Sequence, residues 1–162
     1  MKITPREIKG VNVITSPYPG FPTDLQAPFM ALMATAKGSS KIKEKVFENR
    51  MQHVSQLKKM GASIHLNENV ALITGVKKLK GSNVIGGDLR SSAAIVLACI
   101  SANGNSVFTG LEHLDRGYEN LEEKLNNSGA SIFRKVRKVS YYQTSSKALV
   151  EEENINTNQK AA

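Results

Sequence analysis

The chain has 162 residues, 40% of them hydrophobic, and a formal net charge of +8 from 22 Lys and Arg against 14 Asp and Glu. This length suits a single domain. No apolar run is long enough to cross a bilayer and no charged-then-apolar leader opens the chain, so we expect a cytoplasmic protein without a membrane partner. The one cysteine, Cys99, excludes an internal disulfide framework, and its apolar neighbours predict a buried, inert thiol.

In the first half, apolar periodicity predicts helices alternating with strands. The spacing i, i+3, i+4 and i+7 marks one face of a first helix, formed by Phe29, Leu32, Met33 and Ala36. A second, shorter helix carries Val54, Leu57 and Met60. Gly61 follows, where a glycine commonly ends a helix in the left-handed conformation. Strands are expected over residues 11–14, 41–47, 63–66 and 70–74.

The second half follows the same order. The corresponding helix face is formed by Ala93, Val96, Leu97 and Ile100. A shorter helix before Gly129 carries Tyr118, Leu121 and Leu125. Strands are expected over residues 106–109 and 131–139.

The two halves also share short motifs. Asp-Leu opens a helical run at residues 24–25 and again at 88–89, and Gly-Ala-Ser-Ile closes both halves, at 61–64 and 129–132. We therefore predict an α/β domain over residues 1–139 that consists of two tandem units from one duplication, about 15–75 and 76–139. Residues 140–162 lack a period and are rich in Ser, Glu, Asn and Lys, which predicts a disordered tail.

The positive charge alone does not indicate a nucleic-acid partner. Lysines are spread along the chain, and the few aromatic residues fall mostly at core-like positions rather than between basic residues. A solvated basic surface on a protein with small anionic ligands is the favoured interpretation.

Three arginines give sharper evidence. Arg50, Arg90 and Arg116 each follow an Asn or Asp that resembles a helix cap, in a predicted first turn. A cation there faces the positive end of the helix dipole, which costs a few tenths to about 1 kcal/mol. If the units pack in parallel, the three guanidinium groups converge on a site for phosphate and carboxylate. The alternative is that each arginine pairs locally with its own cap, Asp88 or Asp115.

Asp24 occupies the corresponding helix start in the first unit. A carboxylate at a helix start should stay ionised. The simple interpretation is an N-cap, but beside convergent arginines the same carboxylate becomes a candidate general base. We expect no metal ion and no cofactor.

Four motifs resemble the C-terminal part of the enolpyruvyl transferase family, most closely its members that act on UDP-N-acetylglucosamine in peptidoglycan synthesis. These motifs are FPTDLQ at 21–26, VFENR at 46–50, DLR at 88–90 and HLDRGYE at 113–119. The resemblance runs from about Ile8 to Ile132. It implies an inside-out α/β barrel built from two domains of three units each, of which this chain supplies two units.

The resemblance also implies a reaction and roles for residues. The sugar 3-hydroxyl adds to phosphoenolpyruvate, and the tetrahedral product eliminates phosphate. Asp24 binds the hydroxyl and acts as the base, and Val46 contacts the sugar through its backbone. Phe47 lies beside the intermediate. The carboxylate and phosphate are held by Arg90 and Arg116 in a cleft that Arg50 also lines.

Other parts of such an enzyme are absent from the chain, namely the other domain with its lid-loop cysteine and a Lys-Asn pair. The missing N-terminal part of the same enzyme is therefore an expected partner, and the chain alone is expected to be inactive. Two alternatives stay open: a transferase acting on shikimate 3-phosphate, and a noncatalytic module that binds anions or nucleic acid.

Overall fold

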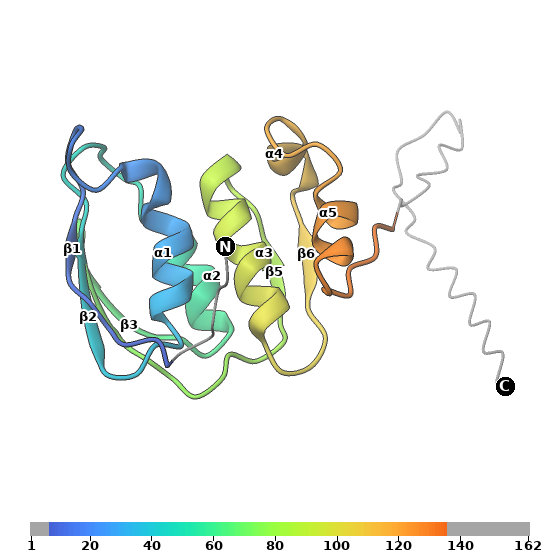
Figure 1. Ribbon diagram of the computed structural model, residues 1–162, viewed down its shortest axis with the longest axis horizontal. Helices are drawn as coiled ribbons and strands as arrows, with labels where there is room; N and C mark the ends of the chain where they lie inside the picture. Colours follow the sequence, from blue (N-terminus) through green and yellow to red (C-terminus); the bar gives the residue numbers. More distant parts are fainter. Residues whose placement is uncertain (1–6, 136–162) are drawn as a thin grey trace, which may run out of the picture.

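The computed structural model describes residues 7–135, in which two sheets are joined by a layer of helices (Figure 1). The larger sheet has the order β1-β2-β4-β3, with strands β1 (Val13–Ile14), β2 (Ser39–Lys43), β3 (Ser63–Asn67) and β4 (Val70–Thr74). β1 and β2 are parallel, and β4 runs antiparallel to both β2 and β3. In the smaller sheet, β5 (Asn83–Ile85) and β6 (Val107–Thr109) pair in parallel. The fold is therefore mixed α/β, as predicted.

Helices connect the parallel strand pairs. The short turn η1 (Thr23–Leu25) and helix α1 (Gln26–Met33) lie between β1 and β2, and α3 (Leu89–Ser101) lies between β5 and β6. Helix α2 (His53–Lys59) leads into β3, and two short helices follow β6, namely α4 (Leu111–Asp115) and α5 (Leu121–Asn127). No helix of residues 7–135 is long and apolar enough to span a bilayer.

The core lies between the inner face of the larger sheet and helices α1, α2 and α3. Alternation along β2 buries Ser40 and Ile42 while Lys41 stays exposed, as a half-buried strand requires. The largest fully buried apolar side chains come from both layers: Met30, Ile42, Leu57, Met60, Ile73, Leu79 and Ile95.

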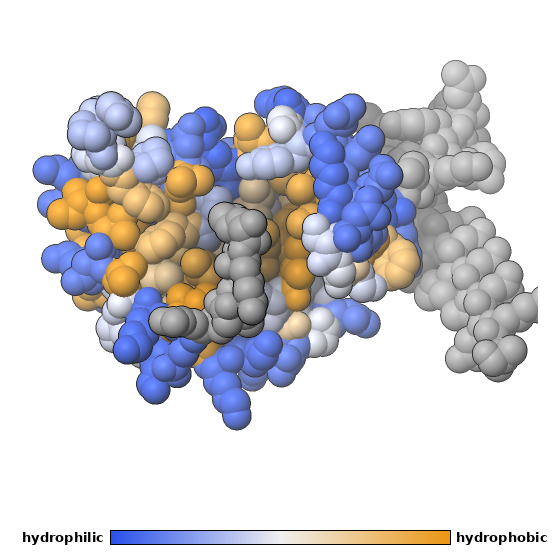
Figure 2. Space-filling model, viewed as in Figure 1, coloured by the Kyte–Doolittle hydropathy of each residue, from blue (hydrophilic) through white to orange (hydrophobic). Residues whose placement is uncertain are grey.

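The predicted faces of the two long helices were partly right, since Met33, Ala36 and Ala93 are buried as expected. Leu32, Leu97 and Ile100 were expected in the core but are 43%, 45% and 40% exposed. The buried face instead carries small side chains, among them Ala31 on α1 and Ala94 on α3, which let the two helices pack closely side by side (Figure 1). Larger side chains such as Met30 and Ile95 are buried on these helices as well. Figure 2 shows apolar surface over α1 and around α3.

Strand boundaries also differ from the predictions, because side chains take over backbone hydrogen bonds. β1 covers only part of residues 11–14, since the N–H of Val11 donates to Ser40 Oγ and Asn12 Oδ1 accepts from the N–H of Lys41. Residues 131–135 form no strand, and Asn126 binds both backbone groups of Ile132. Residues 136–139 lie outside the described part of the chain. Strand β5 and helix α4 were not predicted.

The predicted glycine-terminated helices are confirmed. Gly61 and Gly129 have φ angles of +86° and +96°. After α2, the N–H groups of Gly61 and Ala62 donate to the carbonyls of Lys58 and Leu57, and the same pattern follows α5. This is the Schellman arrangement, which satisfies the last carbonyls of a helix. The helix before Gly129 starts later than predicted, because α5 begins at Leu121 and Tyr118 lies in the connection between α4 and α5.

Candidate functional site

Asp24 is the centre of the candidate site. It lies in η1, directly before α1, and its side chain is 54% exposed. Arg90 Nη2 donates to Asp24 Oδ2 at 2.7 Å, and Arg90 Nε lies 2.5 Å from Oδ1, so the pair is bidentate. Arg50 Nη1 lies 3.3 Å from the same Oδ1. The fold thus brings together one carboxylate and two guanidinium groups from three separate segments.

Arg90 reaches Asp24 from the first turn of α3. Asp88 is the N-cap of that helix, and its Oδ1 accepts from the N–H groups of Arg90 and Ser91 at 2.9 Å each. Ser91 Oγ in turn accepts from the N–H of Asp88 at 3.1 Å, completing a capping box. The predicted cap and the place of Arg90 are therefore confirmed. The carboxylate of Asp24 offsets the unfavourable position of a cation at this end of the helix.

Arg50 is held near Asp24 by contacts with Thr23 and Phe47. Its Nη1 donates to Thr23 Oγ1 at 2.7 Å, and its Cζ lies 4.5 Å from the centroid of the Phe47 ring, a cation–π contact. The Arg50 side chain is 21% exposed. Val46 and Phe47 belong to the loop after β2 and are both exposed. Four predicted site residues therefore lie on two neighbouring segments, with Asp24 on one and Val46, Phe47 and Arg50 on the other.

Two of the three arginines do not occupy a first helical turn, contrary to prediction. Arg50 precedes α2, which begins only at His53, and Asn49 adopts a left-handed φ of 54° in the intervening turn. Arg116 is the C-cap of α4. The prediction failed there because α4 was not recognised, so the Asp115-Arg116 pair was assigned to the following helix. At its actual place Arg116 lies near the negative end of a helix dipole, which favours a cation.

Arg116 shares an end of the fold with the other site residues without joining their contacts. The starts of α1 and α3 and helix α4 all lie at the upper end of Figure 1. The turn after Arg116 packs on α3, since a Cβ on Gly117 would lie 2.9 Å from Leu89 Cδ2. Within residues 7–135, no hydrogen bond or ion pair connects the exposed Arg116 to Asp24 or to the other two arginines.

The alternative of local pairing does not hold for Arg90, whose guanidinium binds Asp24 while Asp88 caps the helix. Asp115 is also engaged elsewhere, because Arg134 donates to its two oxygens at 2.9 Å and 2.8 Å. Arg134 contacts Glu122 as well, with Nε 2.8 Å from Oε1. In the described residues, neither predicted cap carboxylate forms an ion pair with the guanidinium of the arginine that follows it.

The two arginines keep Asp24 ionised. The hydrogen bond from Arg90 holds the pKa of Asp24 below its ordinary value, and the nearby charge of Arg50 adds to this effect. The dominant cause is thus pairing with guanidinium groups rather than the helix start on which the sequence prediction depended. A carboxylate in this state is a weak base until a competing anion engages the arginines.

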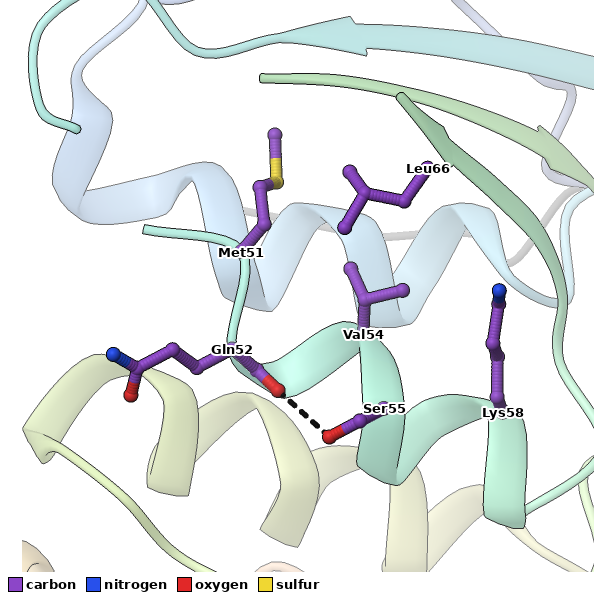
Figure 3. A pocket seen from close by; sticks show the side chains of 6 residues that line it. All are labelled: Met51, Gln52, Val54, Ser55, Lys58 and Leu66. Atoms are coloured by element: carbon purple, nitrogen blue, oxygen red, sulfur yellow. Dashed lines mark hydrogen bonds between the residues drawn. The ribbon is translucent and has the colours of Figure 1, made fainter. Parts of the chain in front are cut away.

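Two pockets in the described residues border this site, since one is lined by Met51, next to Arg50, and the other by Ser91, next to Arg90. The larger, with a volume of about 440 Å³, is formed by α2 and β3 (Figure 3), and its lining comprises Met51, Gln52, Val54, Ser55, Lys58 and Leu66. Its wall is mostly apolar, and it contains none of the predicted site residues. The candidate site is instead an open surface, as expected for one wall of a larger cleft. In the described part of the chain, no group of His, Cys, Asp and Glu is arranged to hold a metal ion.

Sequence reasoning missed two residues that build the site, Thr23 and Glu44. Thr23 connects Arg50 to Glu44, which is only 1% exposed. A signal for Glu44 was present, because it shares the inward phase of the strand pattern with Ile42. The strand was predicted to continue to residue 47, but it ends at Lys43. The N–H groups of Val46 and Phe47 donate to Glu44 Oε1 instead of to a neighbouring strand.

The mixed α/β fold of this chain matches that of a solved enolpyruvyl transferase. The crystal structure of the enolpyruvyl transferase NikO from Streptomyces tendae matches with a TM-score of 0.69 and 30% identity, over 76% of this chain and 28% of that chain. Residues 1–125 match the family model described as EPSP synthase (3-phosphoshikimate 1-carboxyvinyltransferase), and the chain belongs to this family of enolpyruvyl transferases.

Two curated relatives are UDP-N-acetylglucosamine 1-carboxyvinyltransferases from Prochlorococcus marinus. The enzyme of strain NATL2A is 67% identical over 162 residues, which are 100% of this chain and 35% of that protein. The enzyme of strain AS9601 is 56% identical over 155 residues, or 96% of this chain and 34% of the relative. The chain thus spans about a third of the length of these relatives. The match to the NATL2A enzyme also covers the tail, so the prediction that the resemblance ends near Ile132 was wrong.

Proposed function

We propose that the chain supplies part of the active site of a UDP-N-acetylglucosamine 1-carboxyvinyltransferase. This enzyme transfers the enolpyruvyl group of phosphoenolpyruvate to the 3-hydroxyl of the sugar nucleotide and releases phosphate, a step of peptidoglycan synthesis in the cytoplasm. The observation that carries the proposal is the carboxylate of Asp24 held between the guanidinium groups of Arg50 and Arg90. The 67% identity to such an enzyme supports it.

In this proposal Asp24 is the general base. It takes the proton of the sugar 3-hydroxyl while that oxygen bonds to C2 of phosphoenolpyruvate, which yields a tetrahedral ketal. The methylene carbon gains its proton from an acid outside this chain, and the resemblance to the family points to a lid-loop cysteine. In the elimination, the methyl group formed at C3 loses a proton to a base, the C2–O bond to phosphate breaks, the double bond is restored and inorganic phosphate leaves. A positioned base of this kind contributes on the order of 10²–10⁴-fold in rate.

The arginines hold the anionic groups of phosphoenolpyruvate. A guanidinium offers two parallel N–H donors that match carboxylate or phosphate oxygens. In this structure, two N–H donors of Arg90 bind Asp24. When an anion takes those donors, the carboxylate loses its strongest partner and becomes a better base. Arg116 and Arg50 complete the anion site from the same end of the fold.

The loop after β2 contacts the sugar. Val46 and Phe47 are exposed beside Arg50, which supports their assignment to the substrate side. The N–H groups of both residues donate to Glu44. The carbonyl of Val46 is therefore the backbone group left for the sugar, and the Phe47 ring lies beside the intermediate.

The alternative substrate, shikimate 3-phosphate, shares the family and the fold. The family model carries the name of that activity, but the 67% identity with a sugar-nucleotide enzyme favours UDP-N-acetylglucosamine. Nucleic acid is the less favoured ligand, because the gathered arginines already face a carboxylate. The rest of the longer enzyme is the partner that would close the cleft.

We also propose that residues 1–139 contain two copies of one unit, about 15–75 and 76–139. The β1-α1-β2 and β5-α3-β6 segments support this, since each joins parallel strands through a helix. Matching left-handed glycines at Gly38 and Gly104, and at Gly61 and Gly129, also support it.

The test is a chimaera in which this chain replaces the matching 162 residues of the NATL2A enzyme. We expect phosphate release from phosphoenolpyruvate with UDP-N-acetylglucosamine but not with shikimate 3-phosphate, and no release by the isolated chain. Asp24→Asn should lower kcat by about 10²–10⁴-fold. Asp115→Asn, which changes an aspartate paired with Arg134, is the matched control. Wild-type kcat in Asp24→Asn, or turnover of shikimate 3-phosphate, would contradict the proposal.

A further inference from the structure

Glu44 is a buried carboxylate whose oxygens are both engaged. It directly follows β2 and is 1% exposed. Oε1 accepts from Thr15 Oγ1 at 2.7 Å, from the N–H of Val46 at 2.8 Å and from the N–H of Phe47 at 3.1 Å. Oε2 accepts from Thr23 Oγ1 at 2.9 Å. A buried carboxylate with this many donors is a fixed point from which neighbouring groups are positioned.

In the hydrogen bonds that connect Arg50, Thr23 and Glu44, Arg50 donates to Thr23 and Thr23 donates to Glu44. Burial alone would raise the pKa of Glu44, but the hydrogen bonds from Thr15, Thr23 and the loop N–H groups together hold it below its ordinary value. The ionised group cannot donate, so the single hydroxyl proton of Thr23 points to Glu44. The lone pairs of that hydroxyl are then left for Arg50 Nη1, which donates to it at 2.7 Å.

Glu44 therefore contacts two parts of the site, namely Thr23, which binds Arg50, and the loop that carries Val46 and Phe47. Through Thr23 it fixes the guanidinium of Arg50, which also lies 3.3 Å from the carboxylate of Asp24. Through two backbone N–H groups it fixes the loop that presents Phe47, whose ring packs 4.5 Å from the same guanidinium. Glu44 itself is too buried to touch a substrate.

We propose that Glu44 is a positioning residue that orients Arg50 through the hydroxyl of Thr23. The role of this orientation in catalysis rests on the proposed function. The contact network itself is a property of the chain, so the two can be tested separately.

Four variants separate positioning from simple structural support. Glu44→Gln keeps the shape but turns an NH₂ group toward Thr23, which reverses the hydrogen bond and opposes the guanidinium. Thr23→Val removes the connecting hydroxyl, whereas Thr23→Ser keeps it. Thr15→Val is the matched control, because Thr15 Oγ1 donates to Oε1 rather than to the oxygen that binds Thr23, and otherwise accepts from the N–H of Lys45.

The first measurement uses the 162-residue chain and needs no activity. Nuclear magnetic resonance of the Arg50 guanidinium reports its rate of rotation about the Nε–Cζ bond, which is slow when the group is held. We expect rotation several-fold faster in Glu44→Gln and Thr23→Val, and close to wild type in Thr23→Ser and Thr15→Val. An unchanged rate in Glu44→Gln, or an equal increase in Thr15→Val, would overturn the proposal.

The second measurement is a double-mutant cycle in the chimaera with the NATL2A enzyme. Because small displacements of positioning groups can cost up to about 10²-fold in rate, we expect Glu44→Gln to lower kcat/KM for phosphoenolpyruvate by about 10-fold or more. In an Arg50→Ala background the same change should cost less than about twofold, since coupled residues are not additive. Thr23→Ser should retain most of the activity that Thr23→Val loses.

Equal losses from Glu44→Gln in both backgrounds would overturn the positioning role and leave the proposed function intact. If the unmutated chimaera releases no phosphate, the proposed function fails, and the rotation of Arg50 still decides whether Glu44 orients it.

Discussion

At the scale of single residues, the chemistry of the site depends on a carboxylate that already has partners. Asp24 accepts two donors from Arg90 and lies near Arg50, so it is charged and poorly basic in this state. In the proposed reaction, a base that becomes stronger only when an anion engages its arginines would abstract its proton after both substrates are bound. This coupling predicts how the Asp24 titration should respond when one arginine is lost.

The pKa of Asp24 in the chain should lie below its ordinary value of 3.8, because the hydrogen bond from Arg90 stabilises the charged form. Arg90→Gln should move the titration midpoint upward, toward that value. Carbon-detected magnetic resonance of the carboxyl carbon measures both midpoints. Arg134→Gln, which disrupts a different aspartate pair, should leave the Asp24 midpoint in place. An identical midpoint in wild type and Arg90→Gln would show that the ion pair is absent in solution.

His53 should make the folded chain less stable in mild acid. It is 1% exposed, its Nε2 has no partner in the described residues, and burial lowers its pKa from 6.5 to about 4 despite the nearby charge of Asp88. The unfolded chain therefore binds a proton that the folded chain does not bind between these values. Stability falls as pH decreases from about 6.5 to 4, by roughly 3 kcal/mol in total.

Urea unfolding of wild type and His53→Met across that pH range measures this contribution. The difference in the free energy of unfolding between the two proteins should vary with pH, and His65→Gln, at an exposed position on β3, is the control. A difference that is constant from pH 7 to pH 4 would mean that His53 takes up its proton at the same pH in the folded and unfolded chains.

At the scale of elements, the two glycine-terminated helices offer a matched pair. Gly61→Ala and Gly129→Ala each place a Cβ on a residue with positive φ, where no neighbour lies within 4 Å, so the cost is backbone strain alone. That cost is about 1 kcal/mol per site. Helix α2 buries His53, Val54 and Leu57, whereas α5 buries no residue.

We therefore expect Gly61→Ala to lower the free energy of global unfolding by about 1 kcal/mol. Gly129→Ala should instead increase local opening of α5 and change global stability little. Hydrogen exchange of the two helices, with urea unfolding beside it, distinguishes these outcomes. Equal global destabilisation by both changes would place α5 inside the cooperative unit of the fold.

Helix ends and caps, which depend on neighbouring residues in the sequence, were predictable. The buried faces of helices, which depend on packing between distant segments, were predictable only in part. Gly61 and Gly129 end helices through their own conformational freedom, and the Asp88 cap is local as well, so both were found from sequence. Leu32 and Leu97 were misplaced because close packing of alanines on α1 and α3 decides which face is buried.

The same distinction applies to the site. Asp24 and Arg90 were identified from repeated motifs and lie in direct contact. Arg50 lies in a turn before α2 rather than in its first turn, and Arg116 ends a helix rather than starting one. A left-handed Asn49 and the short helix α4 carry no clear periodic pattern. The role of Glu44 was missed, since it depends on donors from segments that are distant in the sequence.

At the scale of the whole molecule, the chain presents an apolar face in the absence of other polypeptides. Leu32 on α1 and Leu97 and Ile100 on α3 are each exposed by 40% or more, and the two helices pack side by side. Figure 2 shows this apolar surface over α1 and around α3. Because the chain spans about a third of the length of its relatives, we expect other parts of the longer enzyme to cover this face.

Left uncovered, the face should drive association of the chain with itself, since contiguous apolar surface is removed from water by contact. We expect the sedimentation coefficient of the wild-type chain to rise with concentration and that of Leu32→Glu/Leu97→Glu to stay at the monomer value. Both positions are 43–45% exposed, so the charges should cost little folding stability. Leu72→Glu is the control, because Leu72 on β4 is 48% exposed but lies on the sheet rather than on α1 or α3. Association that survives the double change, or that the Leu72 change alone abolishes, would show that this helical face is not the surface through which the chain associates.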